Sequence, residues 1–291
     1  MVQEVYQTHM LSEALQLLHQ YGAEAKVIAG GTDLIIQLRN GHVSPKVLID
    51  ISAIEEIKDI REMDNFIEVG STASFTSIET HQLFENKLEA IATAARSIGS
   101  PQIRNRATIG GNICNASPAA DLLPPLLALD AIAILKSSEQ TRMMPLSELI
   151  TGKEQTALRP DEMLERIRFR RPGPRSGLGF SKLGVRNALA IARISMAVYV
   201  EWDATELCRE IRIASGALGI KAQREVDVES FVKGKKLDER VIDETAAFLE
   251  ESTVKRLAGR STLPFKRLAV QGVFRQAVEC ALRDLDRRKK P

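Results

Sequence analysis

Two glycine pairs, far apart along the chain, have the residue types and spacing of phosphate-binding loops. Loop 1 is Gly30–Asp33 (Gly-Gly-Thr-Asp), and loop 2 is Thr108–Asn112 (Thr-Ile-Gly-Gly-Asn). Because glycine has no Cβ, such a backbone can adopt positive φ angles and approach a ligand closely. Successive N–H groups in this conformation can form a concave nest for an anion. Each pair alone is equally compatible with a tight turn, so the sequence leaves both interpretations open for either loop.

The rest of the chain offers little chemistry of its own. It has no carboxylate pair placed for acid–base catalysis, no Cys–His pair and no Gly-x-Ser-x-Gly motif, and its three cysteines lack metal-ligand spacing. We therefore expect no catalytic side chain and no metal site, and infer that a bound cofactor carries the chemistry. FAD would explain two loops, because it presents a pyrophosphate, a ribose, an adenine and a flavin ring.

Several polar side chains could add to the glycine loops. The hydroxyls of Thr32 and Thr108 and the N–H groups of both loops could donate to phosphate oxygens. Asp33 and Asp121 could accept from a ribose hydroxyl or an amide. The alternative for both aspartates is that each caps the helix that follows it.

Loop 1 lies in a short strand–helix–strand pattern. Ala25–Ala29 and Val47–Ile51 are apolar runs typical of buried strands, and Leu34–Arg39 between them predicts one or two helical turns. In a parallel unit of this kind, ligands bind at the carboxyl end of the first strand, where loop 1 begins. The loop lacks the Lys-Ser/Thr of a P-loop and the third glycine of the usual dinucleotide motif.

Downstream patterns predict a mixture of strands and helices. Ile167 and Phe169 alternate with arginines, which predicts a half-exposed strand. The Pro- and Gly-rich segment Arg171–Gly177 is the clearest linker, and we place a domain boundary after residue 175. The expected elements are a hairpin of Glu56–Glu62 with Phe66–Val69, a helix over Asn86–Ser97, paired strands Ala131–Lys136 and Thr141–Met144, strands Phe180–Leu183, Ile191–Trp202 and Cys208–Leu218, and helices Leu237–Glu251 and Pro264–Arg287.

Composition excludes several function classes. The 291 residues carry a net charge of +2 and 44% hydrophobic residues, an ordinary globular composition without a nucleic-acid signal. No run approaches the roughly 18 apolar residues of a membrane span, and no export signal is recognisable. The odd, scattered cysteines do not form a disulfide framework, so we expect a cytoplasmic protein.

Three longer segments resemble the FAD-binding (medium) subunit of the molybdenum hydroxylases, the xanthine dehydrogenase and carbon monoxide dehydrogenase flavoprotein family. Ala29–Leu34 is similar to its first flavin loop, Ile98–Asn112 to its second, and Ala116–Asp121 to the continuation. The resemblance implies an α+β fold. A two-part FAD-binding domain, 1–175 with parts of about 1–55 and 56–175, would precede a C-terminal α+β domain, 176–291, with an antiparallel sheet and helices.

The resemblance also implies a set of cofactor-binding positions. Ile98 and Ile191 match positions that pack on the isoalloxazine ring, and Lys182 could stabilise negative charge on a reduced flavin. The alternative for Lys182 is an ordinary surface lysine in a strand. The full set is Val27, Ile28, Ala29, Gly30, Gly31, Thr32, Asp33, Leu34, Ile98, Thr108, Ile109, Gly110, Gly111, Asn112, Asp121, Leu164, Lys182 and Ile191.

The implied assembly includes a large molybdenum-binding subunit and a small subunit with two 2Fe-2S clusters, as a dimer of heterotrimers. Electrons would reach FAD on this chain and leave to NAD or another acceptor. Val185–Ile191 has no acidic residue, whereas NAD-reducing relatives can carry one there, so the acceptor stays open. Two alternatives are a nucleotide- or anion-binding scaffold without redox work and a self-sufficient FAD oxidase.

Overall fold

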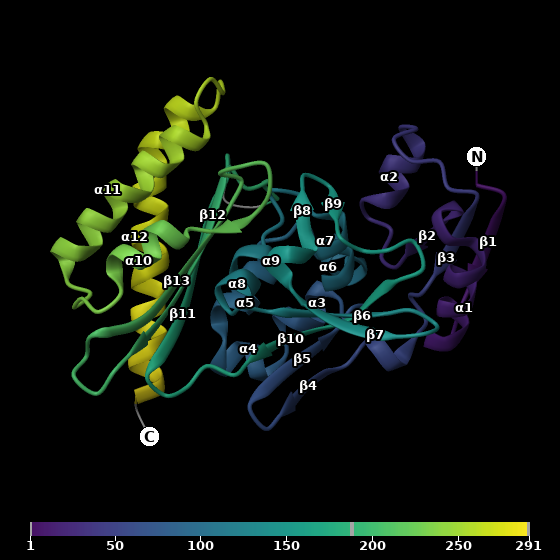
Figure 1. Ribbon diagram of the computed structural model, residues 1–291, viewed down its shortest axis with the longest axis horizontal. Coiled ribbons are helices and arrows are strands. Elements are labelled where there is room, and N and C mark those ends of the chain that lie inside the picture. Colours follow the sequence, from purple (N-terminus) through teal and green to yellow (C-terminus); the bar gives the residue numbers. More distant parts are fainter. Residues whose placement is uncertain (1, 187–188, 290–291) are drawn as a thin grey trace. The chain divides into compact units, whose positions relative to one another are not determined.

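The computed structural model describes residues 2–186 and 189–289 and divides the chain into two compact units (Figure 1). Unit 1 comprises Met1–Ile78, Ser100–Ala116 and Asp130–Arg171. Unit 2 comprises Glu79–Gly99, Ser117–Leu129 and Pro172–Pro291. Each unit is therefore assembled from segments that are distant in sequence. The predicted domain boundary after residue 175 stays a prediction.

Unit 1 begins with a small parallel sheet. β3 (Val47–Asp50) lies in the centre, with β1 (Glu4–Gln7) on one side and β2 (Ala25–Ile28) on the other. α1 (Leu11–Tyr21) buries Leu11, Ala14, Leu15 and Leu18 at helical spacing against this sheet. The predicted strand–helix–strand pattern around loop 1 is present, with α2 at Leu34–Arg39. Sequence reasoning missed β1, because only one of its four residues is even partly buried.

The rest of unit 1 is built on a five-stranded antiparallel sheet, in the order β4-β5-β10-β6-β7, with β8 and β9 forming a separate two-stranded sheet. The predicted hairpin and the predicted strand pair are both part of it. The elements of this part are β4 (Ile60–Met63), β5 (Phe66–Gly70), α3 (Phe75–Glu79), α6 (Pro101–Arg106), α7 (Ile109–Asn115), β6 (Ile132–Lys136), β7 (Thr141–Pro145), α9 (Leu146–Leu149), β8 (Ile150–Gly152), β9 (Gln155–Thr156) and β10 (Met163–Arg170).

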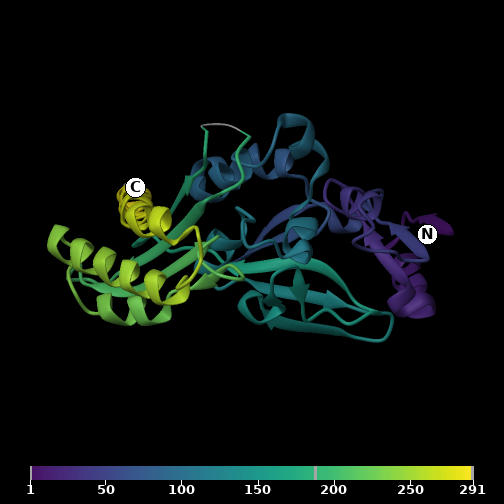
Figure 2. The ribbon, with the colours of Figure 1, turned by 90° about the horizontal axis from the view of Figure 1, so that it is seen from above.

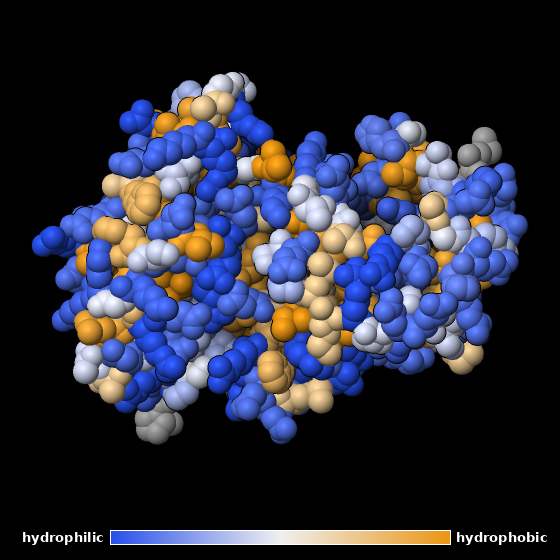
Figure 3. Space-filling model, in the orientation of Figure 1, coloured by the Kyte–Doolittle hydropathy of each residue, from blue (hydrophilic) through white to orange (hydrophobic). Residues whose placement is uncertain are grey.

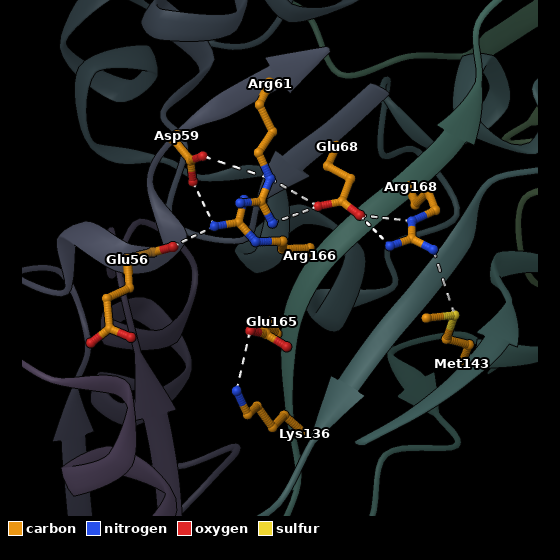
Figure 4. A network of polar contacts seen from close by, with 9 residues as sticks. All are labelled: Glu56, Asp59, Arg61, Glu68, Lys136, Met143, Glu165, Arg166 and Arg168. Carbon is orange, nitrogen blue, oxygen red and sulfur yellow. Dashed lines mark hydrogen bonds and ion pairs between the residues drawn. The ribbon is translucent and has the colours of Figure 1, made fainter. Parts of the chain in front are cut away.

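β10 is the central strand of this sheet and not the half-exposed strand predicted from its alternating arginines. The Arg166 side chain is only 7% exposed and pairs with Asp59 at 2.6 Å. Glu68 is buried between Arg61, at 2.7 Å, and Arg168 (Figure 4). Burial opposes ionisation of Glu68, yet the two arginines hold its pKa below the ordinary value. The sequence pattern misled because two of these arginines have acidic partners: Arg166 pairs with Asp59, which precedes β4, and Arg168 pairs with Glu68 of β5.

Unit 2 is built on a second antiparallel sheet, β11-β12-β13-β14. α10, α11 and α12 cover one face, against Met196, Val198 and Val200 of β12. α11 and α12 lie side by side, as Figure 2 shows. α5 and α8 contact β11, β12 and β13. The elements are α4 (Gln82–Lys87), α5 (Glu89–Arg96), α8 (Leu123–Ala128), β11 (Ser176–Leu183), β12 (Ile194–Trp202), β13 (Cys208–Gly216), β14 (Gln223–Arg224), α10 (Val226–Val232), α11 (Glu239–Arg256) and α12 (Leu263–Lys289).

Two sequence-based element predictions differ from the structure in unit 2. The helix predicted over Asn86–Ser97 is divided at Leu88, whose φ of −146° and ψ of 49° are not helical. This break buries the Leu88 side chain, which is 1% exposed. β12 begins at Ile194, so Ile191 lies in the preceding loop and not in the strand. Asn187 and Ala188 of that loop lie outside the described residues.

The two units together confirm the predicted α+β class, with antiparallel sheets and packed helices. Hydrophilic side chains cover most of the face seen in Figure 3, with apolar ones scattered between them. Among residues 2–186 and 189–289, no helix combines the length and apolar character needed to cross a membrane.

Candidate functional site

Loop 1 presents a row of backbone N–H groups without protein acceptors. It follows β2 at the carboxyl end of the parallel sheet and leads directly into α2. Within the described residues, no hydrogen bond uses an N–H group of Gly30–Asp33 as donor. Gly31 has a φ of +72°, a left-handed conformation that favours glycine. The loop therefore offers several adjacent donors, which is the arrangement that an anion requires.

Loop 1 packs directly against the backbone that enters loop 2. A Cβ on Gly30 would lie 1.9 Å from the carbonyl oxygen of Arg106 and 3.0 Å from the Cα of Ala107. No side chain fits in that space, so only glycine permits this approach. Both residues contacted end or follow α6, immediately before Thr108. The structure thus brings the two predicted loops together, although Arg106 and Gly30 are 76 positions apart in sequence.

Loop 2 differs from loop 1, because its N–H groups are already paired. Ile109 N–H donates to the Ala73 carbonyl at 3.0 Å, and Gly110 N–H donates to the Ser71 carbonyl at 2.8 Å. Gly111 N–H donates to the hydroxyl oxygen of Thr108 at 3.0 Å, an N-cap on α7. A Cβ on Gly110 would lie 2.6 Å from the Ser71 carbonyl oxygen. The backbone of loop 2 is therefore held in place by hydrogen bonds to residues 71–73.

The groups that loop 2 leaves for a ligand are side chains and an open surface. Gly111 is exposed and has no side chain to cover the backbone around it. The Thr108 hydroxyl accepts from Gly111 and keeps its own proton to donate. The Asn112 side-chain oxygen is buried and has no partner within the described residues.

Unit 2 brings together two other predicted residues, Asp121 and Lys182. Lys182 Nζ donates to Asp121 Oδ2 at 2.6 Å and to the Ser97 carbonyl at 2.9 Å. The Lys182 side chain is 12% exposed and that of Asp121 7%, so Lys182 is not an ordinary surface lysine. Burial raises the pKa of Asp121 to about 6, against the opposing effect of Lys182. Asp121 Oδ1 is buried without a hydrogen-bond partner in the described part of the chain.

Neither predicted aspartate caps a helix with its side chain. Asp33 occupies the N-cap position of α2, but its side chain makes no capping hydrogen bond. α8 has Leu122 at its N-cap, and Asp121 precedes that position. The helix-capping alternative is therefore not what the structure shows for either residue.

Three further predicted positions lie in different surroundings. Leu164 is 3% exposed in β10 of unit 1, so it presents very little surface to a ligand. Ile98 is half-buried after α5 in unit 2. Ile191 is 79% exposed in the loop before β12, a position where a large aliphatic side chain is free to contact a partner. The roles of all these positions stay predictions.

The residues of these loops fit FAD. A pyrophosphate is an acceptor-only anion, and loop 1 supplies neighbouring N–H donors with no competing acceptor. The absence of Cβ atoms at Gly30 and Gly31 lets the backbone itself make the contact. The unpaired, buried Asp121 Oδ1 can accept an N–H or O–H of a ligand. Among the described residues, no three His, Cys, Asp or Glu side chains are grouped to hold a metal ion.

Sequence reasoning missed the residues that fix loop 2. The Ser71 and Ala73 carbonyls accept its N–H groups, and Ser71 N–H in turn donates to the Glu165 carbonyl at 3.0 Å. Backbone carbonyls leave no mark in a residue pattern. The one available signal was Gly70-Ser71 directly after a predicted strand, which indicates a close backbone approach.

Comparison with known proteins gives the family. The family model for the FAD binding domain in molybdopterin dehydrogenase matches residues 1–171. The model for the CO dehydrogenase flavoprotein C-terminal domain matches residues 180–281. The nicotinate dehydrogenase FAD-subunit of Eubacterium barkeri is 34% identical over 277 residues, which cover 94% of either chain. The xanthine dehydrogenase FAD-binding subunit of Escherichia coli O157:H7 is 29% identical, covering 94% of this chain and 93% of that one.

A solved structure agrees with these relatives. A chain of the carbon monoxide dehydrogenase from Hydrogenophaga pseudoflava superposes with a TM-score of 0.88 at 25% identity, and 98% of each chain is covered. The resemblance read from the two glycine loops is confirmed, and FAD is the cofactor that the matched domain binds. The chain belongs to the family of FAD-binding medium subunits of the molybdenum hydroxylase dehydrogenases.

Proposed function

We propose that this chain is the electron-transferring flavoprotein subunit of a molybdenum hydroxylase complex. Its partners are a large molybdenum-binding subunit and a small subunit with two 2Fe-2S clusters, and its FAD passes electrons to NAD or another acceptor. Relatives named as an FAD-subunit and as a carbon monoxide dehydrogenase medium chain support this assignment. The proposed complex is a cytoplasmic dimer of heterotrimers.

The observation that carries the proposal is the row of unpaired N–H groups in loop 1, packed against the entry to loop 2. Loop 1 donates to the pyrophosphate through the backbone of residues 31–33. Loop 2 adds the Thr108 hydroxyl and the Asn112 amide. Helix and nest N–H groups are a general solution for binding phosphates.

Lys182 acts on the flavin end of the cofactor in this proposal, and Asp121 binds the cofactor. The Lys182 ammonium group is held in a buried setting by hydrogen bonds to Asp121 and the Ser97 carbonyl. A fixed cation beside a flavin stabilises negative charge on its reduced form. Ile98 and Ile191 supply apolar contact to the ring, and Leu164 lies near the flavin end. FAD supplies the electron transfer itself, and the chain supplies binding, orientation and electrostatics.

The experiment is isolation of the native complex through a tag on this chain. Molybdenum, iron and released FAD are measured together with the identity of the companion chains. The proposal predicts flavin absorbance, molybdenum and iron in one complex that reduces an electron acceptor. FAD without metals and with substrate turnover by this chain alone would instead indicate an oxidase. A nucleotide without redox activity would indicate a scaffold.

A further inference from the structure

α2 is weakly held, although it directly follows loop 1. It has six residues, and none of them is buried. Ile36, in its middle, is 57% exposed. Helices much shorter than about 12 residues are not stable in water without tertiary contacts. The position of α2, and with it the position of loop 1, therefore depends on the few contacts that α2 makes.

One side-chain hydrogen bond joins α2 to the helix that carries loop 2. Gln37 Nε2 donates to Asn115 Oδ1 at 3.0 Å across a half-buried contact. Within the described part of the chain, no other side-chain hydrogen bond links α2 to a different element. Asn115 is the last residue of α7, which begins at Ile109. The contact thus connects the helix after loop 1 with the helix that contains Gly110 and Gly111.

α7 is the firmly held partner in this pair. Its first turn is docked through Ile109 and Gly110 on the carbonyls of Ala73 and Ser71. At its other end, the Ala116 carbonyl accepts the Glu154 N–H at 3.1 Å. A fixed helix is therefore tied to a weakly held one by a single amide pair.

We propose that the Gln37–Asn115 hydrogen bond is a positioning contact that holds loop 1 at a set distance from loop 2 before FAD binds. The close approach of Gly30 to the Arg106 carbonyl fixes loop 1 at its start. The Gln37–Asn115 contact fixes it through the helix that follows its end. Holding a binding loop in its bound conformation raises affinity, because less ordering is needed on binding. The inference rests on the proposed FAD site, but neither residue needs to touch the cofactor.

The test compares the full chain with Gln37→Ala, Asn115→Ala and the double variant. FAD affinity should fall about three- to tenfold in each single variant, the range of one hydrogen bond. The double variant should lose no more than either single one, since both remove the same contact. Amide hydrogen exchange at residues 31–39 of the FAD-free chain should accelerate in all three variants, while the melting temperature changes little.

Glu62→Ala is the matched control. It removes the Arg171–Glu62 contact of 2.8 Å, a long-range side-chain hydrogen bond in the same unit. It should leave FAD affinity and exchange at α2 unchanged.

Each contrary result is distinct. The inference is overturned if the variants leave FAD affinity and amide exchange unchanged. It is also overturned if the losses of FAD affinity add up in the double variant, or if the melting temperature falls while FAD affinity stays the same. A wild-type chain that binds no FAD would overturn the proposed function, and exchange at α2 would still report on the contact itself.

Discussion

Loop 1 and loop 2 share a Gly-Gly sequence but differ in how their backbones are paired. In loop 1 the N–H groups of residues 30–33 have no acceptor within the described residues. In loop 2 the N–H groups of Ile109, Gly110 and Gly111 all have acceptors in the protein. The backbone of loop 2 is held in place by hydrogen bonds within the protein, whereas loop 1 has N–H donors that are unpaired among the described residues and that a ligand can use. Within the described part of the chain, the same short motif therefore has its N–H groups paired in one place and unpaired in the other.

The loops are alike at their first glycine and different at the second. Gly30 and Gly110 both sit against a carbonyl oxygen with no room for a Cβ. Gly31 needs its positive φ, whereas Gly111 is an ordinary helical residue of α7. Substitutions at matched positions separate these roles.

The largest effect is expected for Gly30→Ala and Gly110→Ala. The new Cβ would lie 1.9 Å from Arg106 O in the first and 2.6 Å from Ser71 O in the second, so backbone must move. Each should lower the free energy of unfolding by about 3 kcal/mol or more, measured by denaturant titration without FAD. Gly173→Ala is the control, because nothing lies within 4 Å of its Cβ position. If the two loop variants unfold like the control, the close approaches do not exist.

The next prediction concerns the pH dependence of stability and a carboxyl group outside both loops, that of Asp121. Burial raises the pKa of Asp121 to about 6 from 3.8, so the folded chain holds its proton more tightly than the unfolded chain. Stability contributed by the protonated carboxyl is therefore present at pH 4 and lost as the pH rises to about 6. The free energy of unfolding should fall by up to roughly 3 kcal/mol over this range, because each pKa unit corresponds to about 1.36 kcal/mol.

The matched variant for this titration is Asp121→Asn. In this variant, the fall in unfolding free energy with rising pH should disappear when the FAD-free chain is measured at pH 4, 5 and 6. Equal slopes in the two proteins would show that Asp121 does not titrate in this window.

At the second glycine the two loops should respond differently. Gly31→Ala places an alanine at a φ of +72° and should cost about 1–2 kcal/mol of stability. It should also weaken FAD binding, because the turn presents the free N–H groups. Gly111 lies in a helix, and a Cβ there would meet only the Thr108 hydroxyl, at 3.2 Å. Gly111→Ala should therefore change the stability of the chain little. Equal losses measured by thermal unfolding would remove the distinction between the loops.

The smallest effect is expected at the two threonines. Thr108→Val removes the N-cap of α7 and should cost about 1 kcal/mol in the FAD-free chain. Thr32→Val should leave the stability of the FAD-free chain nearly unchanged and affect only FAD affinity. The pair is measured by unfolding without cofactor and by FAD titration. A stability loss for Thr32→Val as large as that for Thr108→Val would contradict the conclusion that loop 1 is not held by hydrogen bonds within the protein.

Much of this architecture could be predicted from the sequence, since it depends on local patterns. The strand before Gly30, the helix after Asp33 and the antiparallel pairs all follow from periodicity and glycine signals. The difference between the loops could not be predicted. It depends on the Ser71 and Ala73 carbonyls, which are supplied by a distant segment and have no side-chain signature.

Charged residues show the same limit. Arg166 and Arg168 look solvent-facing in sequence, and only the positions of Asp59 and Glu68 explain why Arg166 is buried and Arg168 is half-buried. The Gln37–Asn115 contact joins residues 78 positions apart and could not be predicted from either helix alone.

The most direct test of the central claim is an experimental structure of the full chain loaded with FAD. We expect pyrophosphate oxygens at about 3 Å from the N–H groups of residues 31–33. Loop 2 should keep its hydrogen bonds to Ser71 and Ala73. A pyrophosphate bound elsewhere, with the N–H groups of loop 1 facing solvent, would contradict it.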